Sequence, residues 1–332
     1  MTPEVFLVAD LGAGSLRTAA ITPAGAVLAL DSQPLGAAEP RPGWAEADPE
    51  LWWRALAAGM DRVLARLPAA ARPLALCMTG MTRSQVFLGA DGRSLRPAIL
   101  WRDLRAAEDA GWLAERFPGD NPATAVNAFH PLARLAWVAR AEPETFGRLA
   151  AVLEPKDFLV HRLTGAEAAA DGVTAARLDD LGAVPADAPA WLPRCLDLLG
   201  LPRPMPWQRV GAVGAAEEPF DRLRGVPVFA GAMDTWAGAV GSGACAPGRA
   251  YDVAGTSEAV GLVTGTRIRI PGLVTLPWAE EAFQVGGPTQ AGGDAARWAY
   301  DTHRIAGAFD EALERAGRLA PAADQPVFVP YL

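Results

Sequence analysis

Residues 7–17, LVADLGAGSLR, join an apolar strand to an acid and then to a short glycine-rich stretch. Junctions of this kind bind phosphate in several unrelated folds, because glycine lets the backbone approach a ligand closely. A dinucleotide fingerprint requires GxGxxG at the start of a helix and an acid about 20 residues later. Gly12 and Gly14 fit that pattern and Asp31 lies near the required distance, but Arg17 occupies the third glycine position. The following residues also read as a β-hairpin rather than a helix, which argues against the dinucleotide fingerprint.

Two interpretations of this stretch remain open after the P-loop is excluded. A P-loop needs GK[ST], which does not occur, and the single lysine, Lys156, lies in EPKD, where it fits no protein-kinase motif. In one interpretation the hairpin tip binds phosphate through backbone N–H groups, with Ser15 and Arg17 on phosphate oxygens and Asp10 holding Mg²⁺ directly or through water. In the other, the stretch is an ordinary glycine-containing hairpin with a surface acid.

The bulk composition indicates a packed protein of about two domains. The chain has 332 residues, of which 51% are hydrophobic and 20% charged, and its formal net charge is −8. This negative charge argues against a nucleic acid or an anionic membrane as a partner. The sequence shows no secretory signal and no apolar run long enough to span a membrane, and Cys77, Cys195 and Cys245 are far apart. We therefore expect a cytoplasmic protein with free thiols.

The longest predicted helix covers residues 48–67. Asp48 is a suitable N-cap, and Pro49 suits the first turn. The apolar and long side chains that follow at helical spacing make the helix amphipathic; they are Leu51, Ala55, Ala58 and Arg62.

Turn and stop signals predict the remaining elements. The chain starts as a β-meander, and shorter helices are expected over residues 131–140, 157–165 and 191–199, with Gly165 as the stop of the second. Near residue 230 a second apolar strand runs into an acid and small residues, as at the start of the chain.

Several further motifs follow one another along the chain. They are PGWAEADPELWW (42–53), MTGMTRSQVFLGADG (78–92), ILWRDLR (99–105), EPKDFLVHRLTG (154–165), GAMDTWAGAVGSG (231–243), DVAGTSEAV (252–260), GGPTQAGGDAARW (286–298) and VFVPYL (327–332). In this order they resemble the FGGY carbohydrate kinases, and the xylulokinase branch most of all. The resemblance implies an α/β fold of the actin/hexokinase-like (ribonuclease H-like) type, a two-domain ATPase with mixed sheets flanked by helices.

The resemblance also implies where the reaction takes place. In this family ATP, with Mg²⁺, donates its γ-phosphoryl group to a hydroxyl of a sugar or polyol that lies between two domains. Asp234 matches the catalytic base, and Asp10 matches the acid on the metal side. The expected contacts to the nucleotide phosphates come from two hairpins and are Gly12, Gly14, Ser15, Arg17, Gly255, Thr256 and Ser257. We expect Asp10 and Asp234 to face each other across one gap between the domains.

Sugar recognition is expected from the first domain. Met81, Thr82 and Arg83 align with the family's substrate loop, although they match neither the xylulokinase nor the glycerol kinase residues there. Arg83 offers several donors for hydroxyls or for a carboxylate, so an acidic sugar is one option. Asp103 of the WxDxR motif is a candidate hydroxyl acceptor, and Thr235 follows the base at a position that often touches substrate.

The chain departs from the family at its end and in its first hairpin. The family continues beyond VFVPYL into segments that form the adenine pocket, so we expect a C-terminally truncated protein with an N-terminal domain over residues 1–230 and an incomplete second domain over 231–332. In the first hairpin, Ala13 and Gly14 replace two hydroxyl residues.

Two functions follow from these observations. The first is ATP-dependent phosphorylation of a sugar or polyol by a xylulokinase-like enzyme. The alternative is a truncated remnant that binds sugar without turnover. In both, the partner is a small-molecule sugar or polyol and neither a nucleic acid nor a membrane, and a homodimer is left open.

Overall fold

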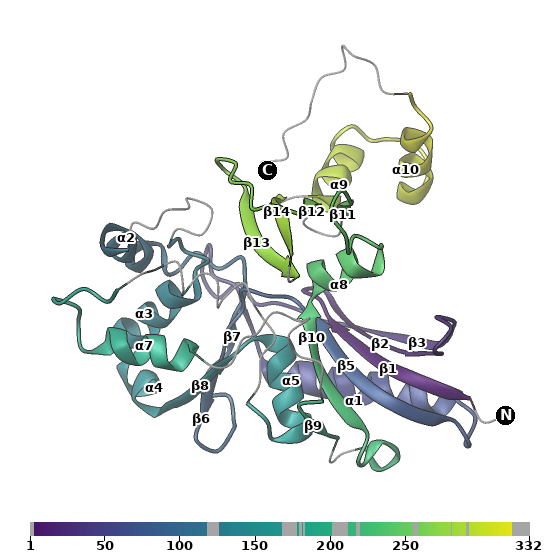
Figure 1. Cartoon of the computed structure of the whole chain (residues 1–332), viewed down its shortest axis with the longest axis horizontal. Helices are drawn as coiled ribbons and strands as arrows, with labels where there is room; N and C mark the ends of the chain where they lie inside the picture. The colour runs from purple at the N-terminus through teal and green to yellow at the C-terminus, as the bar shows by residue number, and fades with distance from the viewer. Residues whose placement is uncertain are drawn as a thin grey trace. The chain divides into compact units, whose positions relative to one another are not determined.

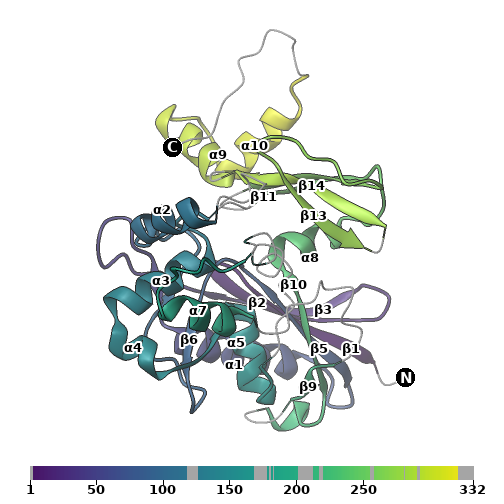
Figure 2. The ribbon, with the colours of Figure 1, turned by 60° about the vertical axis from the view of Figure 1, so that its left-hand side comes forward.

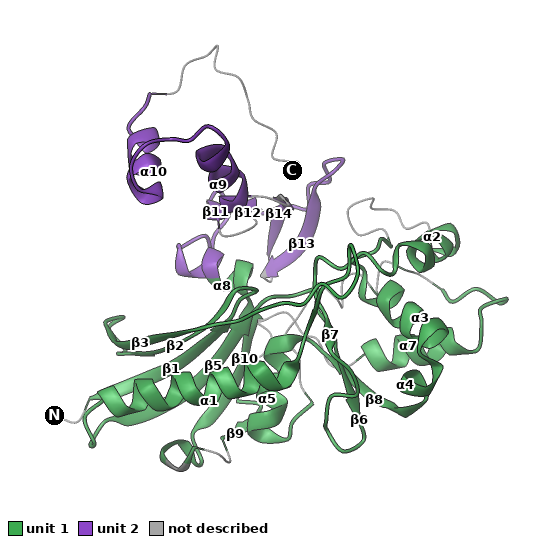
Figure 3. Ribbon diagram, turned by 180° about the vertical axis from the view of Figure 1, so that it is seen from behind, with its two compact units in different colours: residues 1–237 green, residues 238–332 purple. Residues whose placement is uncertain are grey.

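The computed structural model describes residues 3–117, 126–167, 178, 181, 183–200, 212–216, 220–254, 258–279, 281–289 and 292–320, and the structural statements below concern these residues. The chain divides into two compact units, residues 1–237 and 238–332 (Figure 3). The division therefore falls after Ala237, whereas the sequence placed a domain boundary after residue 230.

The first unit is built on a six-stranded mixed sheet with the strand order β3-β2-β1-β5-β10-β9 (Figure 1). Its strands are β1 (Glu4–Leu11), β2 (Ser15–Ile21), β3 (Val27–Pro34), β5 (Arg72–Gly80), β9 (Gly214–Ala215) and β10 (Pro227–Met233). The first three strands pair antiparallel, which confirms the predicted meander. In contrast, β1, β5 and β10 run parallel to one another, so their carboxyl ends share one edge of the sheet.

Two helices cover one face of this sheet. Helix α1 (Pro49–Arg66) packs on β2 and β3, α5 (Pro155–Thr164) packs on β5 and β10, and the two helices contact each other. The side chain of Asp48 accepts a hydrogen bond from the Glu50 amide at 3.0 Å, as expected of an N-cap. Gly165 ends α5 with a φ of 68°, a left-handed conformation that glycine adopts easily.

The predicted helix α1 is confirmed, but the side chains expected to line its apolar face are not the buried ones. Leu51 is exposed, and the residues packed into the core are Trp52, Leu56, Gly59, Met60, Val63 and Leu64. The buried stripe is displaced by one residue because the apolar side chains of Leu51 and Trp52 are neighbours and each can start the same helical period, and packing against the sheet decides between them.

The first unit also contains a second group of helices (Figure 2) and two short ladders. The ladders pair β4 (Glu46–Ala47) with β7 (Ala98–Ile99) and β6 (Val86–Gly89) with β8 (Leu149–Leu153). The helices are α2 (Ala107–Arg116), α3 (Pro131–Ala141), α4 (Pro143–Arg148) and α7 (Trp191–Leu199). The helices predicted over residues 131–140 and 191–199 are therefore confirmed. Within the described ranges, no helix has the length and apolar character needed to cross a membrane.

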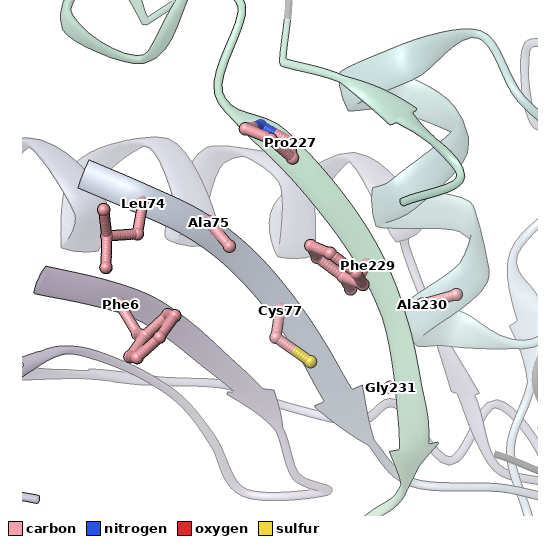
Figure 4. A pocket seen from close by; sticks show the side chains of 8 residues that line it. All are labelled: Phe6, Leu74, Ala75, Cys77, Pro227, Phe229, Ala230 and Gly231. Atoms are coloured by element: carbon pink, nitrogen blue, oxygen red, sulfur yellow. The ribbon is translucent and has the colours of Figure 1, made fainter. Parts of the chain in front are cut away.

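The sheet face opposite α1 and α5 carries an open hollow of about 510 Å³ (Figure 4). Phe6, Cys77 and Phe229 point into it from β1, β5 and β10, and they alternate along these strands with residues of the core. Its lining is almost wholly apolar and lacks the acids that the sequence singled out. The hollow is therefore separate from the candidate site described below.

The second unit contains a four-stranded antiparallel sheet and two helices. The sheet has the order β11-β12-β14-β13, with strands β11 (Ala250–Ala254), β12 (Glu258–Thr264), β13 (Val274–Ala279) and β14 (Ala282–Thr289). Helices α9 (Gly293–Thr302) and α10 (Phe309–Gly317) follow, and the division between the units falls within α8 (Asp234–Gly241).

Close contact between β5 and β10 depends on a glycine. A Cβ on Gly231 would lie 2.5 Å from the carbonyl oxygen of Met78 and 2.9 Å from the sulfur of Cys77. We expect Gly231→Ala to lower the free energy of unfolding by about 1–3 kcal/mol, because the strands must separate to admit the methyl group. Urea denaturation measures the change.

Gly111→Ala is the matched control for this variant, since a Cβ there meets nothing within 4 Å and the residue lies inside α2. It should raise the free energy of unfolding by about 0.5–1 kcal/mol. Equal effects of the two variants would show that strand packing at Gly231 is not tight.

Candidate active site at the carboxyl edge of the sheet

Two acids meet at the edge where the parallel strands end. Asp10 is the second-last residue of β1, and Asp234 follows β10 directly as the first residue of α8. The strand between them, β5, pairs Thr79 with Asp10 and Gly80 with Met233. The parallel register therefore places both acids beside the end of β5, within one unit of the structure.

This arrangement corrects one expectation from the sequence. The two acids do not face each other from two domains, because both belong to residues 1–237. The stretches around Asp10 and Asp234 share the pattern of an apolar strand followed by an acid because they form two strands of the same sheet. Each strand delivers an acid at its carboxyl end, where open α/β sheets commonly bind their ligands.

Short contacts hold the three strand ends together. The hydroxyl of Thr79 donates a hydrogen bond to the carbonyl of Ala232 at 2.7 Å, and the Met81 amide donates to the carbonyl of Leu11 at 2.8 Å. A Cβ on Gly80 would lie 2.8 Å from that same Leu11 oxygen. The absence of a side chain at Gly80 thus lets β1 and β5 converge at the site.

The carboxyl group of Asp10 is partly desolvated. Burial raises the pKa of Asp10, the negative charge of Asp234 raises it further, and Arg17 acts in the opposite direction. Arg17 Nη1 lies 3.8 Å from Asp10 Oδ2, and both side chains are partly exposed. Asp10 Oδ1 is buried and accepts no hydrogen bond from any described residue. A buried carboxylate oxygen of this kind can accept a hydrogen bond from water or bind a cation.

The geometry at Asp10 fits a magnesium ion. Mg²⁺ usually binds proteins through one or two carboxylates and keeps several waters. Among the described residues, no group of three or more acids, histidines or cysteines could chelate a metal by itself. The buried Oδ1 of Asp10, which has no hydrogen-bond donor among the described residues, is the atom that could bind such an ion.

Asp234 sits at the start of α8 and is half-buried. Burial raises the pKa of Asp234, and two hydrogen bonds from Thr235 partly offset that effect. Asp234 Oδ1 accepts from the Thr235 amide at 2.6 Å and from its hydroxyl at 3.2 Å. A carboxylate with a raised pKa holds a proton more readily than an exposed one, which suits a general base.

The tip of the first hairpin lies beside Asp10. The Gly12 amide donates to the Ser15 carbonyl at 2.9 Å, and the carbonyl of Gly14 accepts from Leu35 at the same distance. A Cβ on Gly14 would meet nothing within 4 Å, so the space over this tip is open.

The segment after β5 holds Arg83 in an unusual conformation. Arg83 has a φ of 57°, its amide donates to Glu154 Oε1 at 3.2 Å, and its carbonyl accepts from Arg134. Met81 is buried, and Thr82 Oγ1 is buried without a hydrogen-bond partner among the described residues. Met81 thus acts in packing here, while Arg83 is half-buried and reaches the surface.

Asp103 has a different environment from the one expected of a hydroxyl acceptor. The residue is fully buried, and its carboxylate accepts hydrogen bonds from the Ala45 amide at 2.5 Å and from Arg105 at 2.7 and 2.9 Å. Both oxygens are therefore already used within the protein. The geometry does not support direct binding of a substrate hydroxyl by Asp103, which instead joins segment 43–45 to segment 101–105.

Some predicted site residues cannot be located, and some residues near the site were not predicted. Gly255, Thr256 and Ser257 lie outside the described residues. The sequence reasoning missed Thr79, Glu154 and Arg134, which hold the site from neighbouring elements. For Arg134 a signal existed, since it is the one charged residue between the apolar positions of LARLAWV, but its acceptors are distant in the sequence.

Comparison with known proteins identifies the same family as the sequence motifs. The sequence model described as "FGGY family of carbohydrate kinases, N-terminal domain" matches residues 5–241. The xylulose kinase of Escherichia coli K12 is 34% identical over 259 residues, which cover 76% of this chain and 53% of that protein. The chain thus spans about half the length of the curated relatives it matches.

Solved structures have the same fold. The crystal structure of xylulose kinase from Rhodospirillum rubrum is 27% identical, with a TM-score of 0.78 over 95% of this chain and 67% of that one. Gluconate kinase from Lactobacillus acidophilus reaches a TM-score of 0.77 at 20% identity over 97% of this chain and 67% of that one. These likenesses confirm the predicted fold class.

The raised pKa of Asp234 predicts a specific pH dependence of stability. A carboxyl whose folded-state pKa is raised favours the protonated form on folding, so its charge destabilises the folded state at neutral pH and this cost disappears as the pH falls below about 3.8. We expect Asp234→Asn to unfold at higher urea concentration than the original chain at pH 7, with a difference that shrinks toward pH 4.

The control is Asp61→Asn, at an exposed position of α1. It should leave the urea midpoint unchanged at both pH values. A destabilised Asp234→Asn variant at pH 7 would contradict the assignment of a desolvated carboxylate.

Proposed function

The chain belongs to the FGGY family of carbohydrate kinases, and from this premise we propose that it contributes the base, the metal-side acid and the sugar loop of an ATP-dependent sugar kinase. The observation that carries the proposal is the meeting of Asp10 and Asp234 at one sheet edge, where the charge of one raises the pKa of the other. Ordinary packing gives no reason to place two partly desolvated carboxylates at the ends of the strands on either side of β5.

In this proposal Asp234 accepts the proton of the sugar hydroxyl that attacks the γ-phosphorus of ATP. Its raised pKa brings its proton affinity closer to that needed at neutral pH, and the hydrogen bonds from Thr235 fix one carboxylate oxygen so that the other is free. The proton moves from the hydroxyl oxygen to the Asp234 carboxylate as the new phosphorus–oxygen bond forms and the bond to ADP breaks. Thr235, next to the base, is placed to contact the sugar.

Asp10 and the first hairpin are assigned to the phosphate side of the same site. Asp10 would hold Mg²⁺ directly or through water, and the ion supplies positive charge that offsets the charge of the phosphates. The backbone at Gly14, the hydroxyl of Ser15 and the guanidinium of Arg17 are proposed to contact phosphate oxygens. Gly12 is proposed to act by shaping the tip, because its amide already donates to the Ser15 carbonyl.

Gly255, Thr256 and Ser257, from the motif DVAGTSEAV, are likewise proposed to contact the nucleotide phosphates.

The substrate is proposed to be a small sugar that segment 81–84 recognises. The named relatives are xylulose and gluconate kinases, and Arg83 suits either several hydroxyls or one carboxylate. Asp103 is not proposed to bind the sugar, because both of its carboxylate oxygens accept hydrogen bonds from Ala45 and Arg105.

A second candidate function is sugar binding without turnover. It is favoured by Ala13 and Gly14, which stand in place of hydroxyl residues in the first hairpin. A sugar that raises the melting temperature of the chain without any release of ADP would support this function over the first.

Asp234→Asn tests the assignment of the base. The amide cannot accept the proton but has nearly the same volume, so we expect kcat to fall by at least about 100-fold while sugar affinity stays within about threefold. A coupled assay for ADP release, run with xylulose and with gluconate, measures kcat, and calorimetry measures binding.

Asp61→Asn serves again as the control and should retain full turnover. Turnover of Asp234→Asn close to that of the original chain would rule out Asp234 as the base.

A further inference from the structure

The strongest unexplained feature of the first unit is the fully buried guanidinium of Arg134 on α3. Burial lowers the pKa of Arg134 to about 9. Its Nη1 donates to the carbonyl of Arg83 and to Gln85 Oε1 at 3.1 Å, and its Nη2 donates to the carbonyl of Trp101 at 2.8 Å and, more weakly, to that of Asp103 at 3.4 Å. One side chain thus joins two segments that lie far apart in the sequence.

Stability alone does not account for this arginine. Each of its hydrogen-bond acceptors is a neutral oxygen, and its Nε has no acceptor among the described residues. The negative charges of Asp103 and Glu154 act on the guanidinium, but they only partly offset the lowering of its pKa by burial. Moving a guanidinium out of water to meet neutral acceptors is costly, and an apolar side chain of similar volume is usually at least as stable in such a place. A buried charge at this position is therefore better explained by what it holds in place.

What it holds in place is a strained residue. Arg83 is one of two described non-glycine residues with a positive φ, a conformation that is unfavourable for a long side chain. Arg134 binds the Arg83 carbonyl from one side, and Glu154, which is 2% exposed at the start of α5, accepts a hydrogen bond from its amide on the other. Strain of this kind persists only where the surroundings enforce it, and it is common at ligand sites.

The second segment is tied to the first through the same group. The Trp101 amide donates to the hydroxyl of Ser84 at 3.0 Å, while the Trp101 carbonyl accepts from Arg134. Segments 81–84 and 101–105 are therefore joined both by the guanidinium and by the bond from Trp101 to Ser84.

We propose that Arg134 is a positioning residue that, together with Glu154, fixes the left-handed backbone at Arg83 and so directs the Arg83 side chain toward the sugar. Sugar preference then depends on a residue that does not itself touch the sugar. The part of this inference that concerns the sugar rests on the proposed function, whereas the fixation of the backbone does not.

The variants that test it are Arg134→Met and Arg134→Lys, with Arg140→Met as the control. Arg140 lies on the same helix and forms a two-pronged pair with Asp109 of α2, at 2.9 and 2.8 Å, away from both segments. Arg134→Lys keeps a charge and one donor group, but a single ammonium cannot span both segments.

Amide hydrogen exchange tests the backbone without any ligand. In Arg134→Met the amides of Arg83 and Trp101 should exchange at least about tenfold faster, while those of β1 and β5 stay unchanged. Arg134→Lys should give an intermediate increase and Arg140→Met none. Unchanged exchange at Arg83 and Trp101 in either Arg134 variant would overturn the proposal, and if Arg134→Met does not fold, Arg134→Lys decides the question.

Steady-state kinetics test the effect on the sugar. In Arg134→Met the KM for the sugar should rise about 10- to 100-fold and the ratio of xylulose to gluconate turnover should change, while the KM for ATP stays within about twofold. Arg83→Ala should have the same pattern. Faster exchange with unchanged sugar KM and preference would refute the role in recognition.

Failure of the proposed function gives a different result. If the original chain neither binds nor phosphorylates xylulose or gluconate, the sugar part of the inference falls with that function. Exchange at Arg83 and Trp101 still decides whether Arg134 fixes the backbone.

Discussion

The unfavourable proximity of two carboxylates, Asp10 and Asp234, is the constraint on which the rest of the structure depends. Desolvation raises the pKa of both, and the charge of Asp234 adds to the effect on Asp10. The parallel pairing of β1, β5 and β10 produces this proximity, because it brings the carboxyl ends of all three strands to one edge. The glycines at 80 and 231 let neighbouring strands approach each other closely, because a Cβ at either position would clash with the adjacent strand.

The site therefore costs stability and needs support from the surrounding structure. Hydrogen bonds from Thr79 and Met81 hold the strand ends together, and the core under α1 and α5 supports the sheet from one face. The same principle applies next to the acids, where a buried arginine and a buried glutamate hold Arg83 in a conformation that it would not adopt alone. Conformational strain and repulsion that the fold tolerates in one small region are typical of a functional site.

Local features were predictable from the sequence, and long-range features were not. The meander, the limits of α1 with its Asp48 cap and the stop at Gly165 follow from a few neighbouring residues. The prediction that Asp10 and Asp234 belong to different domains was wrong, because nothing local indicates that β10 pairs with β5. The burial and hydrogen bonding of Asp103 were not predictable for the same reason, since the Ala45 amide that it binds lies 58 residues away. The resemblance to a kinase family identified the acids, and only the strand register showed how they meet.

The most direct test of this arrangement is the titration of the Asp10 carboxyl group, followed by carbon-13 NMR in the original chain and in Asp234→Asn. If the two groups share one edge, Asp10 titrates above the ordinary value of 3.8, and its pKa falls when the neighbouring charge is removed. An Asp10 pKa that is the same in both proteins would show that the acids do not interact and would contradict a common site.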